Sequence, residues 1–297
     1  MTQVDLGRLG VWGHLDSLAA PEAIAYARHA EKLGYGTLWV PETVGREPIA
    51  LLSMLAGATD AINLGTSIIN IWGRDAQAAR MAALTLAEAS GGRFVLGLGV
   101  SHPHLAEKLR GHQFERPLSR MRDYLAAYRA AKYRGPQAED ASEPPVLVAA
   151  LRERMVDLAA TDADGALPYL VTAERVAWMR GRLDAAATGA RPLLAVTLPA
   201  VIGDPDNRDA ARAYLAPYLR TPTYQASWQL QGFAASDWEP PGSDRLVDAM
   251  VAIGPVDLVR RRIGAMLEAG ADHVAIIPLA ADGTTEHAAT LEQLADG

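Results

Sequence analysis

The sequence predicts an α/β fold of the TIM (β/α)8 barrel type, for three reasons. Eight short β-like runs alternate with helical patterns along 297 residues. Such alternation produces parallel βα units. Eight units of about 20–30 residues each suit a closed barrel better than an open doubly wound sheet, which remains the alternative fold. No Ser/Gly-rich or low-complexity linker divides the chain, so we expect one domain over residues 1–297.

The expected elements follow from apolar spacing and from the residues that end each run. The strands are apolar stretches at residues 8–12, 37–40, 63–71, 93–99, 146–150, 166–171, 193–202 and 273–278. The helices are expected at residues 21–33, 47–59, 75–89, 120–132, 152–160, 172–187, 207–219 and 255–269, with a last one from about Thr285. Two longer intervals, at about 101–119 and 221–253, are expected to be insertions over the C-terminal mouth of the barrel.

Composition excludes several classes of function. The formal net charge is −7 and no basic stripe occurs, so we expect no nucleic-acid partner. Cysteine is absent, which excludes disulfides and thiolate metal sites and fits a reducing compartment. The N-terminus lacks the features of a signal peptide, and no run reaches the roughly 18–20 apolar residues of a membrane span. We therefore expect a soluble cytoplasmic protein without a membrane partner.

The candidate functional residues follow the C-terminal ends of the expected strands, where TIM barrels place their active sites. In chain order the candidates are Gly13 and His14, then Pro41, Glu42 and Thr43, then residues 67–72, then Ser101, His102 and His104, then residues 149–152, then residues 169–172.

Several candidates have a plainer structural explanation. Glu42 could be a solvated loop carboxylate, and His14 is more readily structural than catalytic. Thr172 suits the N-cap of the helix that it opens. Arg152 could meet a phosphate at a helix start or lie free on the surface. His29 and His273 are assigned to packing.

The stretch GGRFVLGLGVSHPH, residues 91–104, resembles the start of a phosphate-binding loop but lacks its third glycine. Its glycines also occur in the fourth expected strand and not after the first, so a dinucleotide fingerprint is excluded. Glycines inside a strand instead indicate the close approach of another backbone or a ligand. A metal site at His102 and His104 lacks an evident third ligand. The chain contains no GxSxG, P-loop or HExxH motif.

Four segments, in this order and spacing, resemble a known family: AEKLGYGTLWVPE (30–42), INLGTSIIN (62–70), LAEASGGRFVLGLGVS (86–101) and LEAGADHVAI (267–276). The sequence resembles the bacterial-luciferase-like superfamily of TIM-barrel flavin and deazaflavin oxidoreductases. Within it the chain looks most like the actinobacterial branch that uses coenzyme F420, a 5-deazaflavin.

The resemblance implies where the cofactor would lie. A bulge with a non-prolyl cis peptide supports the ring from behind, and the matching pair is Ser67–Ile68. The place of an acidic residue at the ring is taken by Glu42. Asn70 and Ser101 join this cofactor-binding set. Backbone N–H groups after the fifth strand would hold the phosphate at Ala150, Leu151 and Arg152, where relatives often have glycines, and Thr172 would assist.

The resemblance also places a proton-transfer residue after the fourth strand. Sugar-phosphate dehydrogenases of the family have a glutamate there, and the matching residue is His102. An imidazole with a pKa near 6.5 can donate or accept a proton near neutrality. The dehydrogenase chemistry of those relatives is therefore not carried over to this chain.

These inferences predict hydride transfer between C5 of coenzyme F420 and a small organic substrate. The expected catalytic residues are His102, which would move the proton, and Glu42, which would lie near the ring. Residues 228–238 would form a lid or substrate wall, or else a packed insertion. The alternatives are an FMN-dependent monooxygenase, a non-catalytic flavin-binding homologue, and a zinc hydrolase built on His102 and His104. A homodimer is expected from the resemblance alone.

Overall fold

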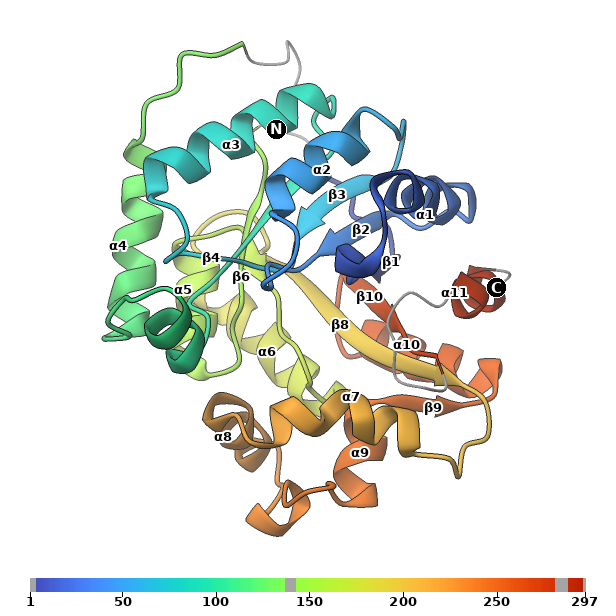
Figure 1. Ribbon diagram of the computed structural model, residues 1–297. Coiled ribbons are helices and arrows are strands. Elements are labelled where there is room, and N and C mark those ends of the chain that lie inside the picture. The colour runs from blue at the N-terminus through green and yellow to red at the C-terminus, as the bar shows by residue number, and fades with distance from the viewer. Residues whose placement is uncertain (1–3, 137–142, 281–287, 296–297) are drawn as a thin grey trace.

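A closed barrel of parallel strands forms the centre of the protein, as the computed structural model shows (Figure 1). The structure describes residues 4–136, 143–280 and 288–295. Around the barrel the strands follow the order β10-β1-β2-β3-β5-β6-β7-β8, and β8 pairs with β10 to close the ring. Every pairing is parallel. The expected TIM barrel is thus confirmed, and closure excludes the open sheet.

The strands agree with the expected runs in most places. Their bounds are β1 Leu9–Trp12, β2 Thr37–Val40, β3 Asn63–Thr66, β4 Ile69–Asn70, β5 Phe94–Gly99, β6 Val146–Val148, β7 Gly165–Ala166, β8 Leu193–Ile202, β9 Ala252–Gly254 and β10 His273–Pro278. The strand expected at 63–71 is interrupted, because Ser67 and Ile68 leave the ladder between β3 and β4. β7 is shorter than expected, since Pro168 lacks a backbone N–H and Leu170 has φ of 55°. The three-residue β9 lies at the end of the second insertion. It pairs in parallel with the C-terminal end of β8.

Helices cover the outside of the barrel, as Figure 1 shows. The helices of the described chain are α1 Ala20–Lys32, α2 Pro48–Ala56, α3 Ala76–Ala89, α4 Pro117–Ala130, α5 Glu153–Thr161, α6 Ala173–Ala186, α7 Asp209–Leu219, α8 Pro222–Leu230, α9 Asp244–Met250, α10 Val256–Glu268 and α11 Ala288–Ala295. α4 begins earlier than expected because Pro117 suits a first helical turn. Thr285, where the last helix was expected to start, lies outside the described residues.

Both expected insertions contain helical structure of their own. The first holds a short π-helix, η2 Leu105–Leu109, and the second holds α8, the 3-10 helix η3 Ala235–Asp237, and α9. The second insertion and α7 share a separate hydrophobic core around Trp228, Leu246 and Leu215. This lobe stands at the C-terminal end of β8, below the barrel in Figure 1.

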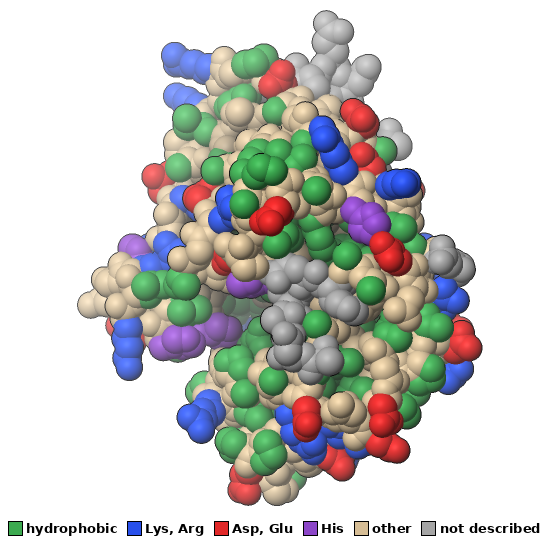
Figure 2. All heavy atoms as spheres, turned by 45° about the vertical axis from the view of Figure 1, so that its right-hand side comes forward, with side chains coloured by type: hydrophobic (Ala, Val, Ile, Leu, Met, Phe, Trp, Pro, Cys, Tyr) green, Lys and Arg blue, Asp and Glu red, His purple; other side chains and the backbone are tan. Residues whose placement is uncertain are grey.

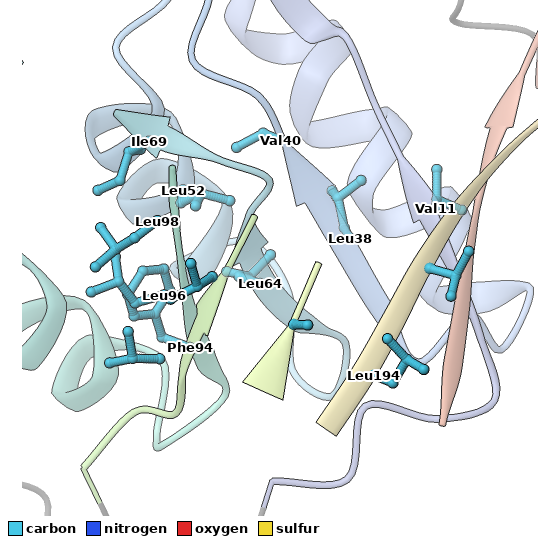
Figure 3. Packing of buried hydrophobic residues seen from close by; sticks show 14 of the residues in the cluster. Val11, Leu38, Val40, Leu52, Leu64, Ile69, Phe94, Leu96, Leu98 and Leu194 are labelled. Carbon is cyan, nitrogen blue, oxygen red and sulfur yellow. The ribbon is translucent and has the colours of Figure 1, made fainter. Parts of the chain in front are cut away.

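Alternate strand residues face two different cores, as the period of two in a strand requires. Leu38, Leu64 and Leu96 point outward and pack with Leu52 of α2 (Figure 3). Their neighbours Trp39 and Val95 point inward, into the smaller core of the barrel interior.

The barrel interior also contains a buried histidine, His273 of β10. Its Nε2 accepts a hydrogen bond from Trp39 Nε1 at 2.9 Å. Its Nδ1 therefore carries the proton and donates to the Gly7 carbonyl oxygen at 2.7 Å. The packing role expected for His273 agrees with this position. Burial lowers the pKa of His273 to about 4, so the ring is neutral in the folded protein.

This buried histidine should make stability depend on pH between about 6.5 and 4. In that window the unfolded chain binds a proton at His273 that the folded chain does not bind. The free energy of unfolding therefore decreases as pH falls, by about 1.4 kcal/mol per pH unit. Over the whole window the loss is about 3 kcal/mol. Urea unfolding at several pH values, compared between the wild type and His273→Gln, measures the effect. We expect a flatter profile in the variant, and equal slopes would contradict the prediction.

Candidate active site

The C-terminal ends of β2, β4 and β5 bring most of the predicted site residues to one rim. Asn70 of β4 pairs with Gly99 of β5, two residues before Ser101. The backbone N–H of Glu42, just after β2, donates to the Ile68 carbonyl oxygen at 3.2 Å. Glu42, Ile68, Asn70 and Ser101 thus follow neighbouring strands around the rim, as the strand-end rule predicts.

The expected non-prolyl cis peptide is present between Ser67 and Ile68. The Ser67 carbonyl oxygen accepts a hydrogen bond from Trp12 Nε1 of β1 at 3.1 Å. Gly97 and Gly99 of β5 pack directly behind this segment. A Cβ on Gly97 would lie 1.9 Å from the Thr66 carbonyl oxygen, and one on Gly99 would lie 2.5 Å from Ile68 Cδ1. The two strand glycines therefore permit close approach of the β3–β4 segment, in agreement with the sequence interpretation.

The carboxylate of Glu42 is buried and fully engaged by protein groups. Oε2 accepts a hydrogen bond from the backbone N–H of Asn70 at 2.6 Å, and the Asn70 amide also donates to it. Oε1 forms ion pairs with Arg74 at 3.1 Å and Arg110 at 3.3 Å. Neither arginine was singled out from the sequence, because the partners are 32 and 68 residues from Glu42. The arrangement favours a positioning role for Glu42 over proton transfer.

Asn70 stabilises the turn that follows β4. Its Oδ1 accepts hydrogen bonds from the backbone N–H groups of Trp72 at 3.0 Å and Gly73 at 2.7 Å. Trp72 in turn donates from Nε1 to the Val100 carbonyl oxygen at 2.7 Å and packs against Phe114 of the first insertion. The chain from Glu42 through Asn70 and Trp72 thus fixes the first insertion over the rim.

His102 lies just after β5, between two other rings. Its ring centroid is 6.0 Å from that of His104, with nearly parallel planes, and 5.5 Å from that of Tyr224 in α8. Nδ1 of His102 is buried and has no hydrogen-bond partner among the described residues. Burial, and to a smaller extent the charge of His104, lowers the pKa of His102. The imidazole is therefore neutral near pH 7 and able to accept a proton.

Four tyrosines near His102 form an aromatic wall, which we define as Tyr169, Tyr214, Tyr218 and Tyr224. Tyr169 follows β7, Tyr214 and Tyr218 lie on α7, and Tyr224 lies on α8. Tyr218 contacts Tyr169 and Tyr224 edge to face, with centroids 5.4 and 5.2 Å apart. The two α7 tyrosines were not predicted as site residues, although their spacing of four residues places both on one helix face.

The predicted phosphate residues lie at the start of α5 and α6. Ala150 is buried, while Arg152 is exposed and precedes α5 without a side-chain cap. The Leu151 carbonyl oxygen accepts from Arg175 Nη2 at 2.7 Å.

Thr172 is the N-cap of α6, as expected. Its hydroxyl accepts from the backbone N–H of Arg175 at 3.2 Å. Its own N–H donates to Gln231 Oε1 at 2.8 Å, which links the second insertion to the barrel. Both groups that could meet a phosphate are thus engaged by the protein.

His14 lies beside this group, because its ring stacks on that of Trp12 with centroids 6.3 Å apart, and Trp12 donates to the Ser67 carbonyl oxygen. His14 lies 3.6 Å from Asp16, whose carboxylate also accepts from the backbone N–H of Arg46 at 2.8 Å. Within the described part of the chain, no three His, Asp or Glu side chains come together to hold a metal ion, and no helix is both long and apolar enough to cross a membrane.

Comparison with known proteins places the chain in a family. Residues 2–273 match the sequence pattern described as "Luciferase-like monooxygenase". The chain belongs to this family. It is therefore an enzyme of the luciferase-like superfamily, which favours catalysis over a non-catalytic homologue.

One relative and two solved structures illustrate the range of this luciferase-like group. "Putative coenzyme F420-dependent oxidoreductase Rv3520c" of Mycobacterium tuberculosis is 28% identical over 322 residues, covering 89% of this chain and 91% of the relative. The F420-dependent tetrahydromethanopterin reductase of Methanopyrus kandleri superposes with a TM-score of 0.75 at 16% identity, covering 99% and 98% of the two chains. The oxygenating constituent of 3,6-diketocamphane monooxygenase of Pseudomonas putida, in complex with FMN, gives 0.71 at 17% identity, covering 97% and 96%. The two structural likenesses show the shared fold.

Proposed function

We propose that this luciferase-like enzyme transfers a hydride between coenzyme F420 and a small organic substrate, with His102 moving the accompanying proton. The relative from M. tuberculosis supports the choice of cofactor, because its match extends over nine-tenths of its length. The proton-transfer role of His102 rests on one observation. Its buried Nδ1 has no hydrogen-bond partner among the described residues.

The residues at the rim fit a bound deazaflavin. The buried Nδ1 of His102 offers a hydrogen-bonding atom that the described protein does not use. α5 begins just after Arg152 with no side-chain cap, so its first backbone N–H groups and the exposed Arg152 guanidinium suit a phosphate. Ser67, Ile68 and Ser101 would lie by the ring, and Ala150, Leu151 and Arg152 by the phosphate. When bound, the deazaflavin supplies two-electron hydride chemistry.

The protein's own residues would then divide the remaining work. A neutral His102 accepts the proton of a substrate hydroxyl, or returns it in the reverse direction after protonation. Glu42 holds Asn70, Arg74 and Arg110 in place through its two carboxylate oxygens and does not exchange a proton. The α7–α9 lobe covers the β8 side of the mouth and restricts the access of water.

Cofactor titration of the purified protein tests this proposal against an FMN-dependent monooxygenase. The fluorescence of the cofactor monitors the titration. We expect saturable binding of F420 and no saturable binding of FMN at the same concentrations. Arg152→Ala should weaken F420 binding, while the substitution Arg134→Ala, at a site beyond α4, should leave it unchanged. Tight FMN binding with oxygen-dependent turnover would overturn the proposal.

A further inference from the structure

Two groups of side chains lie at different sides of the mouth. Glu42, Arg74 and Arg110 lie on the side of β2 and β4, where both arginines pair with Glu42. On the side of β5, β7 and β8 lie His102 and the aromatic wall. Figure 2 shows a hollow on one face of the molecule, bordered by histidine and hydrophobic side chains.

The aromatic wall is held together by its own members. Tyr169 contacts Tyr224 edge to face at 5.8 Å between centroids, and Tyr214 contacts Tyr218 at 5.7 Å. The hydroxyls of Tyr169 and Tyr214 are hydrogen-bonded to each other. Behind the wall Tyr224 packs on the fully buried Trp228, 6.0 Å away. Tyr169, Tyr214 and Tyr218 remain partly exposed.

The hydroxyls of Tyr169, Tyr214 and Tyr224 carry no charge at neutral pH. Burial raises the pKa of Tyr169 and Tyr214 well above the usual value, and that of Tyr224 as well, so these hydroxyls stay protonated. After burial, the groups that act most strongly on these three hydroxyls are other tyrosines of the wall.

This environment discriminates between anionic and neutral ligands. A carboxylate or phosphate placed against the wall would lose its hydration, and the tyrosines of the wall supply no cationic counter-ion. A flat uncharged molecule would instead bury apolar area and stack against the partly exposed tyrosines. A hydroxyl or carbonyl group on such a molecule would find hydrogen-bonding partners in the phenol groups and in His102.

We propose that the aromatic wall binds an uncharged aromatic substrate bearing a hydroxyl or carbonyl group, oriented with that group toward His102. This inference rests on the proposed function for the role of His102, but the binding itself requires no cofactor. The wall thus selects the substrate class, and Tyr218 is the specificity-determining residue because it contacts both Tyr169 and Tyr224.

Calorimetric titration of the full chain without cofactor tests this inference with two probes that share one ring system. The neutral probe is methyl 2-naphthyl ketone and the charged probe is 2-naphthoate. We expect the ketone to bind at least about tenfold more tightly, the equivalent of about 1.4 kcal/mol. Equal or tighter binding of the carboxylate overturns the proposal.

Substitutions at Tyr218 show whether the binding occurs at the wall. Tyr218→Leu should weaken ketone binding about three- to tenfold, since it removes two aromatic contacts. Tyr218→Phe keeps the ring and should retain the affinity for the ketone. It provides a second variant at the same position in case Tyr218→Leu does not fold. Tyr133→Leu, beyond α4, is the matched control and should have no effect. Unchanged ketone affinity in Tyr218→Leu overturns the proposal. If the ketone binds but the protein does not bind F420, the proposed function is wrong and the proposed selectivity of the aromatic wall is supported.

Discussion

His102→Ala is expected to lower kcat by about 10²–10⁴-fold, the range that a positioned general acid or base contributes. The reason is that the other proton acceptors at this part of the rim are less suited to the task, since His104 is exposed to solvent. The neighbouring Glu42 is held in its ion pairs with Arg74 and Arg110. Steady-state kinetics with an alcohol or carbonyl substrate measures the effect, and the F420 dissociation constant of the same variant shows whether cofactor binding is retained.

His104→Ala is the matched control for this substitution. His104 is exposed and stacks on His102, so its loss should change kcat far less. It should also move the pKa of His102 upward, because the charge of His104 helps to lower it. Full activity in His102→Ala, or an equal loss in both variants, would show that another group moves the proton.

The pH profile provides an independent check on His102. Because burial lowers its pKa below the usual 6.5, the imidazole is already deprotonated at neutral pH. For oxidation of an alcohol, kcat/KM should be constant near neutrality and decline only below pH 6.5, as His102 becomes protonated. An acid limb above pH 6.5 would be inconsistent with this assignment.

The barrel could be predicted because its signal is local and repeated. Runs such as residues 37–40 and 273–278 are buried on both faces, so they are almost entirely apolar and end at a proline, a glycine or a polar residue. β7 and β9 could not be predicted in the same way. Two or three residues of ladder give no periodicity, and their position depends on pairing with β8. The helices of the second insertion pack on each other, so their apolar pattern does not point to the barrel.

The site could be predicted only as far as the strand-end rule extends. That rule selected Glu42, Asn70 and His102 because each lies at or just after the C-terminal end of a parallel strand. The ion pairs of Glu42 and the contacts of Tyr218 depend on how distant segments meet above the rim. For this reason the sequence indicated where chemistry would occur, while the grouping of Glu42 with two arginines and of His102 with the aromatic wall came from the structure.

Gly97→Ala is expected to have the largest effect on stability. The added methyl group would lie 1.9 Å from the Thr66 carbonyl oxygen and 2.7 Å from Leu167 Cδ1. The Gly97 N–H also donates to Thr66 Oγ1 at 2.8 Å, and that hydroxyl donates to the Gly97 carbonyl oxygen at 2.9 Å. The backbone must therefore shift and weaken both bonds. We expect a loss of about 3 kcal/mol or more, at or beyond the usual cost of overpacking.

Gly181→Ala provides the matched control, because Gly181 lies within α6 and a Cβ there would meet nothing within 4 Å. It should raise stability by about 0.5–1 kcal/mol through helix propensity. Thermal unfolding measures both variants, with Gly97→Ala lower by at least about 5 °C. Wild-type stability in Gly97→Ala would mean that the β3–β4 segment can move away from β5. In that case the position of Ser67 and Ile68 would not depend on the glycine, and the packing explanation for the strand glycines would be wrong.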